Sequence, residues 1–244
     1  MSIAECNNII AKNRDKWREV PATLMDRMFS SDLMVKSDSE LISYWDMCRQ
    51  QHARYDVKGW FHDIYKYQFE GKRVLDVGSG IGIDGITFAE NGAKVTFADI
   101  VSENQTLLKR ICALKGISAE FYYIDDCENF KFETKFDAIT AIGSLHHIPF
   151  ELAKKEIAAL NEHLIVGGKF CMFTYPKERY EECKCSSFEE FGKKTDGKRT
   201  PWAEWYDAEK IQKLFGSNYH LNWWRNFGQS NTEFNWFELS KLSD

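Results

Sequence analysis

The most informative segment of the chain is Val74-Leu75-Asp76-Val77-Gly78-Ser79-Gly80-Ile81-Gly82, an apolar run that leads into three alternating glycines. The run predicts a buried strand, and the residues after the glycines favour a helix. Glycine lets the backbone turn tightly and approach a ligand closely, while the first turn of a helix offers unpaired N–H groups. The segment therefore predicts a ligand-binding turn between a strand and a helix.

Short apolar runs alternate with amphipathic stretches from Arg73 onward. Each run is rich in Val, Ile, Phe or Tyr, which is typical of strands, and strands separated by crossover helices form parallel sheets. The fold class is therefore α/β, a Rossmann-like open sheet that is mostly parallel and has helices on both faces. The predicted strands are residues 73–77, 94–99, 120–124, 137–142 and 169–175.

Helix signals lie between and after these strands. Ser102-Glu103-Asn104-Gln105 has the spacing of a capping box, and Gly116 supplies a stop for the helix that follows. A second helix is predicted from about Glu151 to the residues before Gly167, and a third between Asp207 and Gly216.

The two ends of the chain differ from its centre. The aromatic runs 219–225 and 232–239, separated by the turn-forming residues 228–231, predict a C-terminal antiparallel hairpin. The first 71 residues lack strand patterns and are dense in Trp, Tyr and Phe. We predict an N-terminal helical cap over residues 1–71 and an α/β domain over residues 72–244, with a polar substrate loop at about 176–206.

The composition limits the classes of partner that the chain is expected to bind. The chain has 244 residues and a formal net charge of -5, which does not favour nucleic acid. No apolar run is long enough to cross a bilayer, and the N-terminal residues lack the apolar core of a signal peptide. We therefore expect a cytoplasmic protein with a small-molecule partner and no membrane partner. The oligomeric state stays open.

The cysteines predict neither disulfides nor a metal. Seven cysteines at irregular spacings favour reduced thiols. Cys183 and Cys185 form one close pair, but no second pair or neighbouring His completes a ligand set. We expect no metal site.

The glycine turn has two interpretations. Gly80, Gly82 and Gly85 fit a dinucleotide fingerprint, but the same spacing counted from Gly78, the first glycine after the strand, places Ile83 at the third position. With Asp76 two residues before the glycines, the segment instead resembles the (D/E)xGxGxG pattern of class I S-adenosylmethionine-dependent methyltransferases.

Further motifs continue this resemblance in order. Asp99 ends the second strand, Asp125 ends the third, and Leu145-His146-His147-Ile148 follows the fourth like the family's "LHHI" loop. Leu164 to Phe170 resembles the "LkpGG" turn before the fifth strand. The resemblance covers Val74 to Tyr175 and implies a methyltransferase of the small-molecule type, with S-adenosylmethionine as cofactor and S-adenosylhomocysteine as its product.

The resemblance also implies roles for single residues. Asp76 would lie under the methionine end of the cofactor, Asp99 would accept hydrogen bonds from both ribose hydroxyls, and Asp125 would take the adenine amino group. The implied cofactor residues are Asp76, Gly78, Ser79, Gly80, Gly82, Asp99, Ile100, Asp125, Asp126, Cys127, Ile142 and Gly143.

The methyl acceptor is less defined. In-line displacement at a sulfonium depends mainly on positioning, so a base is optional. His147, beside the reactive methyl, is the candidate base, and Tyr175, at the end of the fifth strand, is the candidate for orienting the acceptor. The predicted substrate-binding residues are Arg54, Tyr55, Trp60, His146, His147, Tyr175, Trp205 and Tyr206.

These observations favour methyl transfer to an oxygen of a small polar acceptor, such as a sugar, a surface-polysaccharide precursor, or a phosphate or phosphoramidate oxygen. Lys193, Lys194, Lys198 and Arg199 would recruit a phosphorylated or carboxylated acceptor. The alternatives are an N-methyltransferase of a small amine, a nucleotide-dependent oxidoreductase and a non-catalytic cofactor-binding protein.

Overall fold

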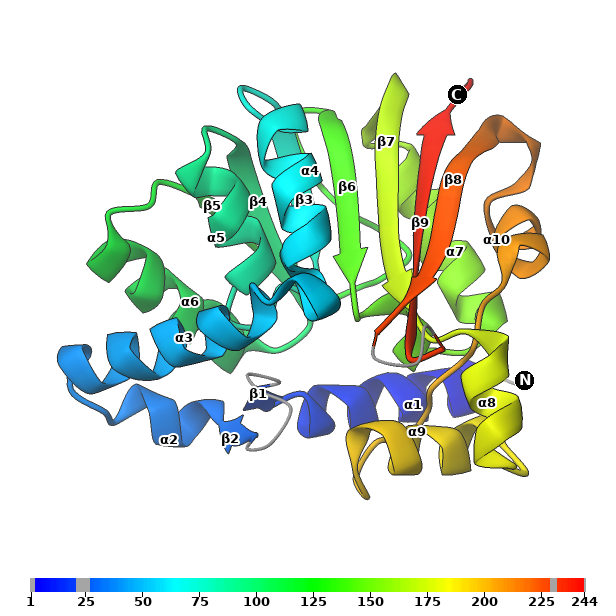
Figure 1. Cartoon of the computed structure of the whole chain (residues 1–244), viewed down its shortest axis with the longest axis horizontal. Coiled ribbons are helices and arrows are strands. Elements are labelled where there is room, and N and C mark those ends of the chain that lie inside the picture. The colour runs from blue at the N-terminus through cyan, green and yellow to red at the C-terminus, as the bar shows by residue number, and fades with distance from the viewer. Residues whose placement is uncertain (1–2, 21–26, 229–231, 244) are drawn as a thin grey trace. The chain divides into compact units, whose positions relative to one another are not determined.

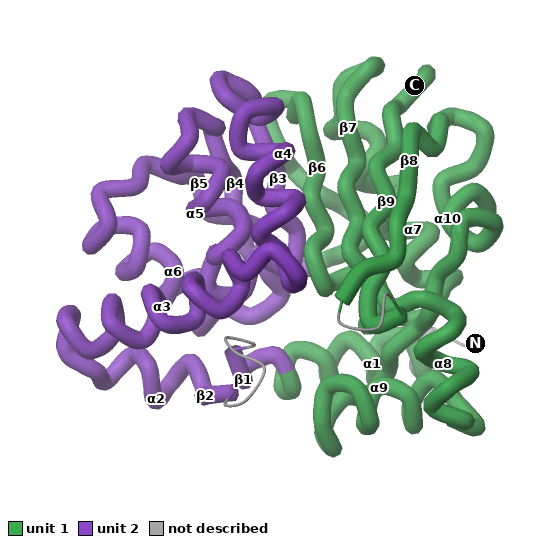
Figure 2. Tube along the Cα trace, in the orientation of Figure 1, with its two compact units in different colours: residues 1–16, 126–244 green, residues 17–125 purple. Residues whose placement is uncertain are grey.

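The structure, a computed structural model, describes residues 3–20, 27–228 and 232–243. The chain forms two compact units, which Figure 2 shows in different colours. Unit 2 comprises residues 17–125, and unit 1 comprises residues 1–16 and 126–244. The division at residue 71 stays a prediction. No helix in the described part of the chain is long and apolar enough to cross a membrane.

Unit 2 holds the glycine turn and the strands β3, β4 and β5, whose arrangement Figure 1 shows. Its elements are β1 (Glu19–Val20), β2 (Met28–Phe29), α2 (Ser30–Met34), α3 (Asp38–His52), a π-helical turn η1 (Tyr55–Gly59), α4 (Trp60–Gln68), β3 (Arg73–Val77), α5 (Ile83–Glu90), β4 (Lys94–Asp99), α6 (Ser102–Lys115) and β5 (Glu120–Tyr123). The segment before β3 is largely helical, as predicted, but the short antiparallel pair β1–β2 was not predicted.

The strands of unit 2 lie in the order β5-β4-β3 and are parallel. Their bounds match the predicted strands to within a residue. Helix α6 also forms where it was predicted, but Ser102 is its first helical residue and Val101 its N-cap, so the predicted capping box does not form. The cap position is supported instead by the Asp99 carboxylate, which accepts a hydrogen bond from the Val101 N–H at 2.8 Å.

Unit 1 contains α1 and everything after β5. Its elements are α1 (Ile3–Lys16), β6 (Phe136–Ile142), a 3-10 turn η2 (Leu145–His147), α7 (Phe150–Asn161), β7 (Leu164–Thr174), α8 (Lys177–Cys183), α9 (Phe188–Asp196), α10 (Ala208–Phe215), a second 3-10 turn η3 (Gly216–Asn218), β8 (Tyr219–Phe227) and β9 (Phe234–Lys241).

The strands of unit 1 lie in the order β6-β7-β9-β8. β6 and β7 are parallel, whereas β9 pairs antiparallel with both β7 and β8. The predicted mixed α/β fold with a mostly parallel sheet and an antiparallel C-terminal hairpin is therefore confirmed. Residues 229–231 of the predicted hairpin turn lie outside the described residues. β7 begins five residues earlier than predicted, because Leu164 already pairs with Phe136 across a register shift.

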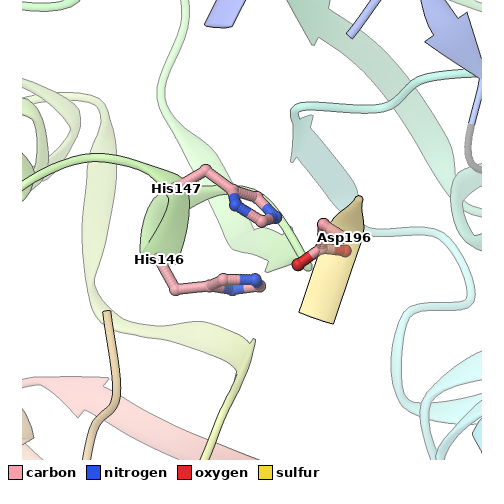
Figure 3. Close-up of side chains that lie close together, drawn as sticks. All are labelled: His146, His147 and Asp196. Atoms are coloured by element: carbon pink, nitrogen blue, oxygen red, sulfur yellow. The ribbon is translucent and has the colours of Figure 1, made fainter. Parts of the chain in front are cut away.

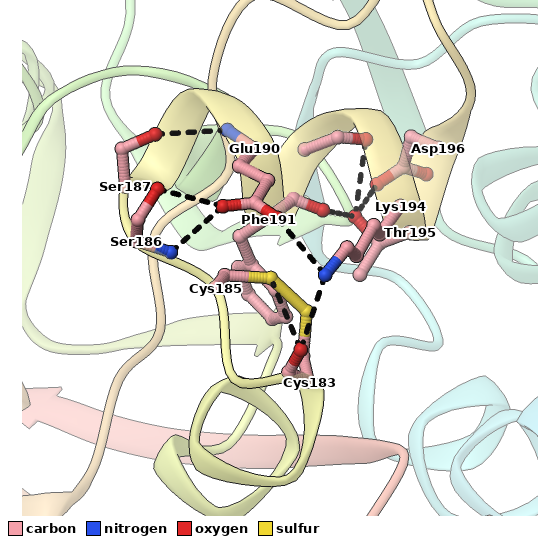
Figure 4. The surroundings of a disulfide bond; sticks show 10 residues. Cys183, Cys185, Ser186, Ser187, Glu190, Phe191, Lys194, Thr195 and Asp196 are labelled. Atoms are coloured by element: carbon pink, nitrogen blue, oxygen red, sulfur yellow. Dashed lines mark hydrogen bonds and ion pairs between the residues drawn. A yellow bond between two sulfur atoms is a disulfide. The ribbon is translucent and has the colours of Figure 1, made fainter.

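The segment at 176–206 was expected to be a loop, but it contains α8 and α9. Helix α9 buries Phe191, whose ring lies 5.6 Å from the ring of Tyr175 and 5.2 Å from that of Tyr180. The Ser187 side chain caps α9 by accepting a hydrogen bond from the Glu190 N–H at 3.1 Å (Figure 4). A buried aromatic and a cap are sufficient to order a short helix.

Cys183 and Cys185 form a disulfide between the end of α8 and the start of α9 (Figure 4). The expectation of reduced thiols is wrong for this pair. The intervening Lys184 has a left-handed backbone with φ of 49°, and this turn brings the two flanking side chains together. The other five cysteines are free thiols.

The buried carboxyl of Glu156 on α7 makes the stability of the fold depend on pH. Burial raises the pKa of Glu156 from 4.5 to about 8, so near neutrality the folded chain keeps a proton that the unfolded chain releases. Stability is therefore greatest below the unfolded pKa and declines as the pH rises toward 8. We expect the Tm to fall between about pH 6 and 8, and Glu156→Gln to flatten this slope.

Thermal unfolding followed by circular dichroism at several pH values measures the effect. The matched control is Glu162→Gln, because Glu162 is exposed at the end of the same helix and should leave the wild-type slope intact. An unchanged slope in Glu156→Gln would contradict the assignment.

Candidate functional site

The glycine turn of unit 2 joins β3 to α5. The N–H groups of Gly78 and Ser79 both donate to the Ala98 carbonyl, at 2.7 and 3.2 Å, so the turn is attached to the end of β4. Gly78, Gly80 and Gly82 have φ values of 74°, 54° and 71°. Such positive values favour glycine. At Gly82 a Cβ atom would also lie 2.4 Å from Leu108 Cδ1, so glycine is required there.

Asp99 holds the turn from the neighbouring strand. Its Oδ2 accepts a hydrogen bond from the Gly80 N–H at 2.8 Å, while Oδ1 accepts one from the Val101 N–H at 2.8 Å. Burial raises the pKa of this carboxyl to about 6, against the opposing effect of these hydrogen bonds. Ile100, the next residue, is half-buried. The geometry places a titratable acceptor directly beside the glycine backbone.

Asp76 and Ser79 add two buried polar groups to the same region. A Cβ atom on Gly85 would lie 2.8 Å from Asp76 Oδ2, so the carboxylate lies against the first turn of α5. The hydroxyl oxygen of Ser79 is buried and has no hydrogen-bond partner in the described part of the chain. Trp45 of α3 supports the turn from the side, because its Nε1–H donates to the Ile81 carbonyl at 2.9 Å.

The remaining predicted cofactor residues follow β5 and β6. Asp125 is the last residue of unit 2, and Asp126, Cys127, Ile142 and Gly143 belong to unit 1. Asp126 accepts a hydrogen bond from the Glu128 N–H at 2.9 Å, and Cys127 and Ile142 are buried. Gly143 has φ of 79°, which is the left-handed conformation of a turn after β6. The structure thus brings Asp76, Gly78, Ser79, Gly80, Gly82 and Asp99 together within one unit.

In unit 1 the turn η2 and the last residue of α9 form a cluster of His146, His147 and Asp196 (Figure 3). The two imidazole rings lie 4.1 Å apart and point toward the carboxylate. One nitrogen or oxygen of each residue lies within 4.8 Å of the others. The sequence predicted both histidines but not Asp196.

The hydrogen bonds of His147 fix its tautomer. Its Nδ1–H donates to the Trp202 carbonyl at 3.0 Å, so Nε2 is the nitrogen that can accept. The His147 backbone is held as well, because the Asn13 Nδ2–H donates to its carbonyl at 2.7 Å. Residues from α1 and from the segment after α9 therefore position this side chain.

His146 is buried with 1% of its surface exposed, and within the described residues neither ring nitrogen makes a hydrogen bond of good geometry, although the Phe173 carbonyl is a nearby acceptor. Burial, followed by the neighbouring His147, lowers the pKa of His146 well below its ordinary value. The ring is therefore neutral at physiological pH. A buried polar group without a partner costs free energy, which makes this position a candidate for ligand contact.

Tyr175 follows β7 and joins the cluster. Its hydroxyl donates to Asp196 Oδ2 at 2.8 Å, and its ring lies 4.5 Å from the ring of His146. The Thr195 hydroxyl donates to the same carboxylate oxygen at 2.8 Å. The predicted pair His147 and Tyr175 thus occurs in one buried group around Asp196.

Trp205 and Tyr206 lie beside Tyr175, and the Tyr206 N–H donates a hydrogen bond to the Tyr175 carbonyl at 2.9 Å. Tyr206 is buried, and its hydroxyl has no hydrogen-bond partner among the residues that the structure describes. Burial, together with the charge of Glu204, raises the pKa of this phenol. The ammonium nitrogen of Lys210 lies 4.2 Å from the centre of the Trp205 ring.

The three substrate residues predicted in the cap belong to unit 2. Arg54 is paired with Asp56 at 2.7 Å, and Tyr55 is exposed. Trp60 is buried and packs edge-on against Phe61. The structure therefore does not gather Arg54, Tyr55 and Trp60 into one group.

Sequence reasoning missed one further buried group in unit 2. The Asp84 carboxylate accepts hydrogen bonds from Lys58 Nζ at 2.6 Å and from His62 Nε2 at 2.7 Å. Burial acts to raise the pKa of Asp84, but the charges of Lys58 and His62 outweigh it and hold this pKa below its ordinary value. The three residues come from separate elements at no recognisable spacing, so no sequence signal identifies them.

Comparisons with known proteins show the family of the chain. Residues 49–234 match the methyltransferase domain family. The ubiquinone biosynthesis O-methyltransferase of Actinobacillus pleuropneumoniae serotype 5b is 26% identical over 240 residues, covering 88% of this chain and 91% of that relative. The ribosomal RNA small subunit methyltransferase G of Laribacter hongkongensis is 34% identical over 113 residues, covering 44% and 51%. In several such alignments the chain spans about half the length of the curated relative.

Among solved structures, magnesium protoporphyrin IX methyltransferase from Synechocystis PCC 6803 with bound SAH superposes with a TM-score of 0.62. The alignment covers 98% of each chain at 18% sequence identity. This similarity establishes a shared fold.

A buried ion pair supports the segment that carries Trp202 and Trp205. Glu204 accepts hydrogen bonds from Lys210 Nζ at 2.6 Å and from Trp202 Nε1 at 3.0 Å, and its N–H donates to the His146 carbonyl at 2.7 Å. Glu204→Gln leaves the Lys210 ammonium without its counter-ion. We expect a loss of about 3 kcal/mol in the free energy of unfolding. This value is at the lower end of the range for breaking a buried ion pair, because Lys210 is partly exposed.

Chemical denaturation measures this loss. Glu209→Gln removes the exposed helical pair with Lys213 and is the matched control, for which little change is expected. Equal stability of the Glu204→Gln and Glu209→Gln proteins would contradict the role of the buried pair.

Proposed function

Because the chain belongs to the methyltransferase domain family, we propose that it transfers the methyl group of S-adenosylmethionine to an oxygen atom of a small polar acceptor. The observation that carries this proposal is the glycine turn, whose backbone is held beside the buried Asp99 carboxylate. In the reaction the acceptor oxygen supplies an electron pair to the methyl carbon, and the electrons of the broken C–S bond stay on sulfur. The products are S-adenosylhomocysteine and a methylated acceptor that has lost a proton.

The cofactor-binding role of the turn follows from its donors and acceptors. Asp99 already accepts backbone hydrogen bonds, and we infer that it also accepts them from the two ribose hydroxyls, with N–H groups at the start of α5 as further donors. Asp76 supplies negative charge for the methionine end, which carries an ammonium and a sulfonium. Ile100, Asp125, Asp126, Cys127, Ile142 and Gly143 complete the proposed cofactor set.

His147 and Tyr175 are the residues proposed to touch the acceptor. The tautomer of His147 leaves Nε2 to accept a hydrogen bond from an acceptor hydroxyl, and the Tyr175 oxygen can accept a second because its proton is donated to Asp196. Holding the acceptor in line with the methyl group accounts for much of such catalysis. His146, Trp205 and Tyr206 are proposed to line the same end, and Arg54, Tyr55 and Trp60 remain proposed substrate contacts.

A basic cavity in unit 1 favours an anionic acceptor. It has a volume of about 470 Å³ and is lined by Lys12, Lys193, Lys198 and Arg199. Two acids of the lining pair with two of these cations, Asp15 with Arg199 at 2.6 Å and Glu189 with Lys193 at 2.7 Å, so the cavity keeps an excess of two positive charges. Asn13 and Trp202, which hold His147, are close in sequence to these residues. A phosphorylated sugar, a surface-polysaccharide precursor or a phosphoramidate has the charge and size for this cavity. The net charge of -5 argues against nucleic acid as the acceptor.

The raised pKa of Asp99 makes cofactor affinity depend on pH. Below about pH 6 the carboxyl is protonated and loses acceptor capacity, so protons compete with the ribose hydroxyls. We expect the affinity for S-adenosylhomocysteine to fall by up to about tenfold per pH unit below pH 6. Asp99→Asn should bind more weakly at pH 8 and show no such slope. Calorimetric titration measures both, and identical curves for the two proteins would exclude Asp99 from the site.

The acceptor proposal is tested by mass spectrometry with deuteromethyl-labelled S-adenosylmethionine. The acceptor panel comprises phosphorylated sugars, neutral sugars, small amines and RNA, so that each alternative gives its own labelled product. Label on an oxygen of an anionic sugar supports the proposal, and label on an amine or on RNA overturns it.

His147→Gln should lower kcat/KM for this acceptor by about a hundredfold, because the acceptor loses its orientation. Affinity for S-adenosylhomocysteine should be unchanged. The control is His220→Gln, which alters an exposed residue of β8 and should have wild-type activity. Full activity in His147→Gln would remove this residue from the acceptor site.

A further inference from the structure

The cluster of His146, His147 and Asp196 gathers three strong metal ligands in a buried place. Their side chains are 1%, 4% and 8% exposed, and one donor atom of each lies within 4.8 Å of the others. Figure 3 shows both imidazole rings facing the carboxylate. Two ligands of one zinc ion lie at most about 4.2 Å apart, so small rotations of these side chains would close the widest spacing.

The chain satisfies the polar atoms of His146 poorly. Both ring nitrogens are buried, and within the described residues neither makes a hydrogen bond of good geometry, although the Phe173 carbonyl is a nearby acceptor. The His146 ring packs against the rings of His147 and Tyr175 at 4.1 and 4.5 Å. Coordination of an ion by one of these nitrogens would remove the cost of burying it.

The other two residues already have the outer contacts that are typical of metal ligands. A ligating imidazole usually donates its second N–H to a carbonyl, and His147 Nδ1–H donates to the Trp202 carbonyl at 3.0 Å. A ligating carboxylate is usually hydrogen-bonded as well. Asp196 Oδ2 accepts hydrogen bonds from the hydroxyls of Tyr175 and Thr195, both at 2.8 Å.

We propose that His146, His147 and Asp196 bind one divalent transition-metal ion of the zinc or iron(II) class. Two imidazole nitrogens and one carboxylate oxygen suit such ions, whereas magnesium and calcium prefer oxygen ligands alone. Three protein ligands leave a coordination position open for a water or an acceptor oxygen. When the ion is bound, Nε2 of His147 coordinates it and no longer accepts a hydrogen bond from the acceptor. The acceptor oxygen then binds the ion directly.

The test is a titration of chelator-treated, untagged protein with cobalt(II), followed by its visible absorption, and then displacement by zinc(II) in a calorimeter. The wild-type protein should bind one ion per chain. His146→Ala and Asp196→Asn should weaken binding by more than the roughly 10- to 100-fold that loss of an outer contact costs. His220→Ala, which removes an exposed histidine, should bind like the wild type.

Two outcomes overturn the site: no saturable binding of one ion to the wild-type protein, or unchanged affinity in Asp196→Asn. This variant keeps an oxygen for the Tyr175 hydroxyl, so it decides the question if His146→Ala does not fold, as judged by circular dichroism. Binding of S-adenosylhomocysteine is measured in parallel. A protein that binds this compound but no metal loses the ion site and keeps the proposed methyl transfer, whereas one that binds metal alone loses the proposed function.

Discussion

The hydrogen bond from the Gly80 N–H to the buried Asp99 carboxylate is the contact on which the cofactor end of the protein depends. It joins a turn that only glycine can form to the end of the neighbouring parallel strand. The Gly78 and Ser79 N–H groups donate to the Ala98 carbonyl, which makes the same connection through the backbone. A carboxyl kept out of water in this way has a pKa of about 6, so it is ionised at neutral pH but protonated in mild acid. Because the fold has already removed water from this carboxylate, the ribose hydroxyls would bind it without displacing water.

The proposed acceptor end is organised around a second buried carboxylate, that of Asp196. Asp196 holds the Tyr175 hydroxyl, and the Trp202 carbonyl holds Nδ1 of His147. Both supports come from α9 and the segment that follows it, so the ordering of this region sets the positions of the reactive side chains. The Glu204–Lys210 pair and the packing of Phe191 on Tyr175 keep that segment folded. Such preorganisation is what methyl transfer by positioning needs.

Much of the fold was predictable because the buried strands are short apolar runs between glycines and polar residues. The strands at 73–77 and 94–99 were predicted with their observed bounds. The proximity of the glycine turn to Asp99 was predictable as well, since one local pattern places these residues on the turn and at the next strand end, whereas their contacts with a cofactor stay a prediction. The predicted capping box at Ser102 was wrong, because the residue types that favour an N-cap also occur at the first position of a helix. Only the backbone geometry of Val101 identifies Val101 as the N-cap.

What the sequence did not reveal depends on contacts between distant residues. Asp196 joins His146 only after α9 folds beside β7, and no spacing in the chain marks that meeting. The polar composition of 176–206 suggested a loop, yet the single buried face that Phe191 provides is enough to order α9. The Cys183–Cys185 disulfide likewise depends on the left-handed backbone of Lys184, which residue identity does not predict.

The most direct measurement is amide hydrogen exchange of the wild-type protein with and without S-adenosylhomocysteine. Slower exchange in peptides that cover residues 76–84 and 97–101, with no change in residues 219–227 of β8, is the predicted result. Unchanged exchange in both cofactor segments at saturating ligand, or protection confined to other parts of the chain, would contradict a methyltransferase built around Gly80 and Asp99.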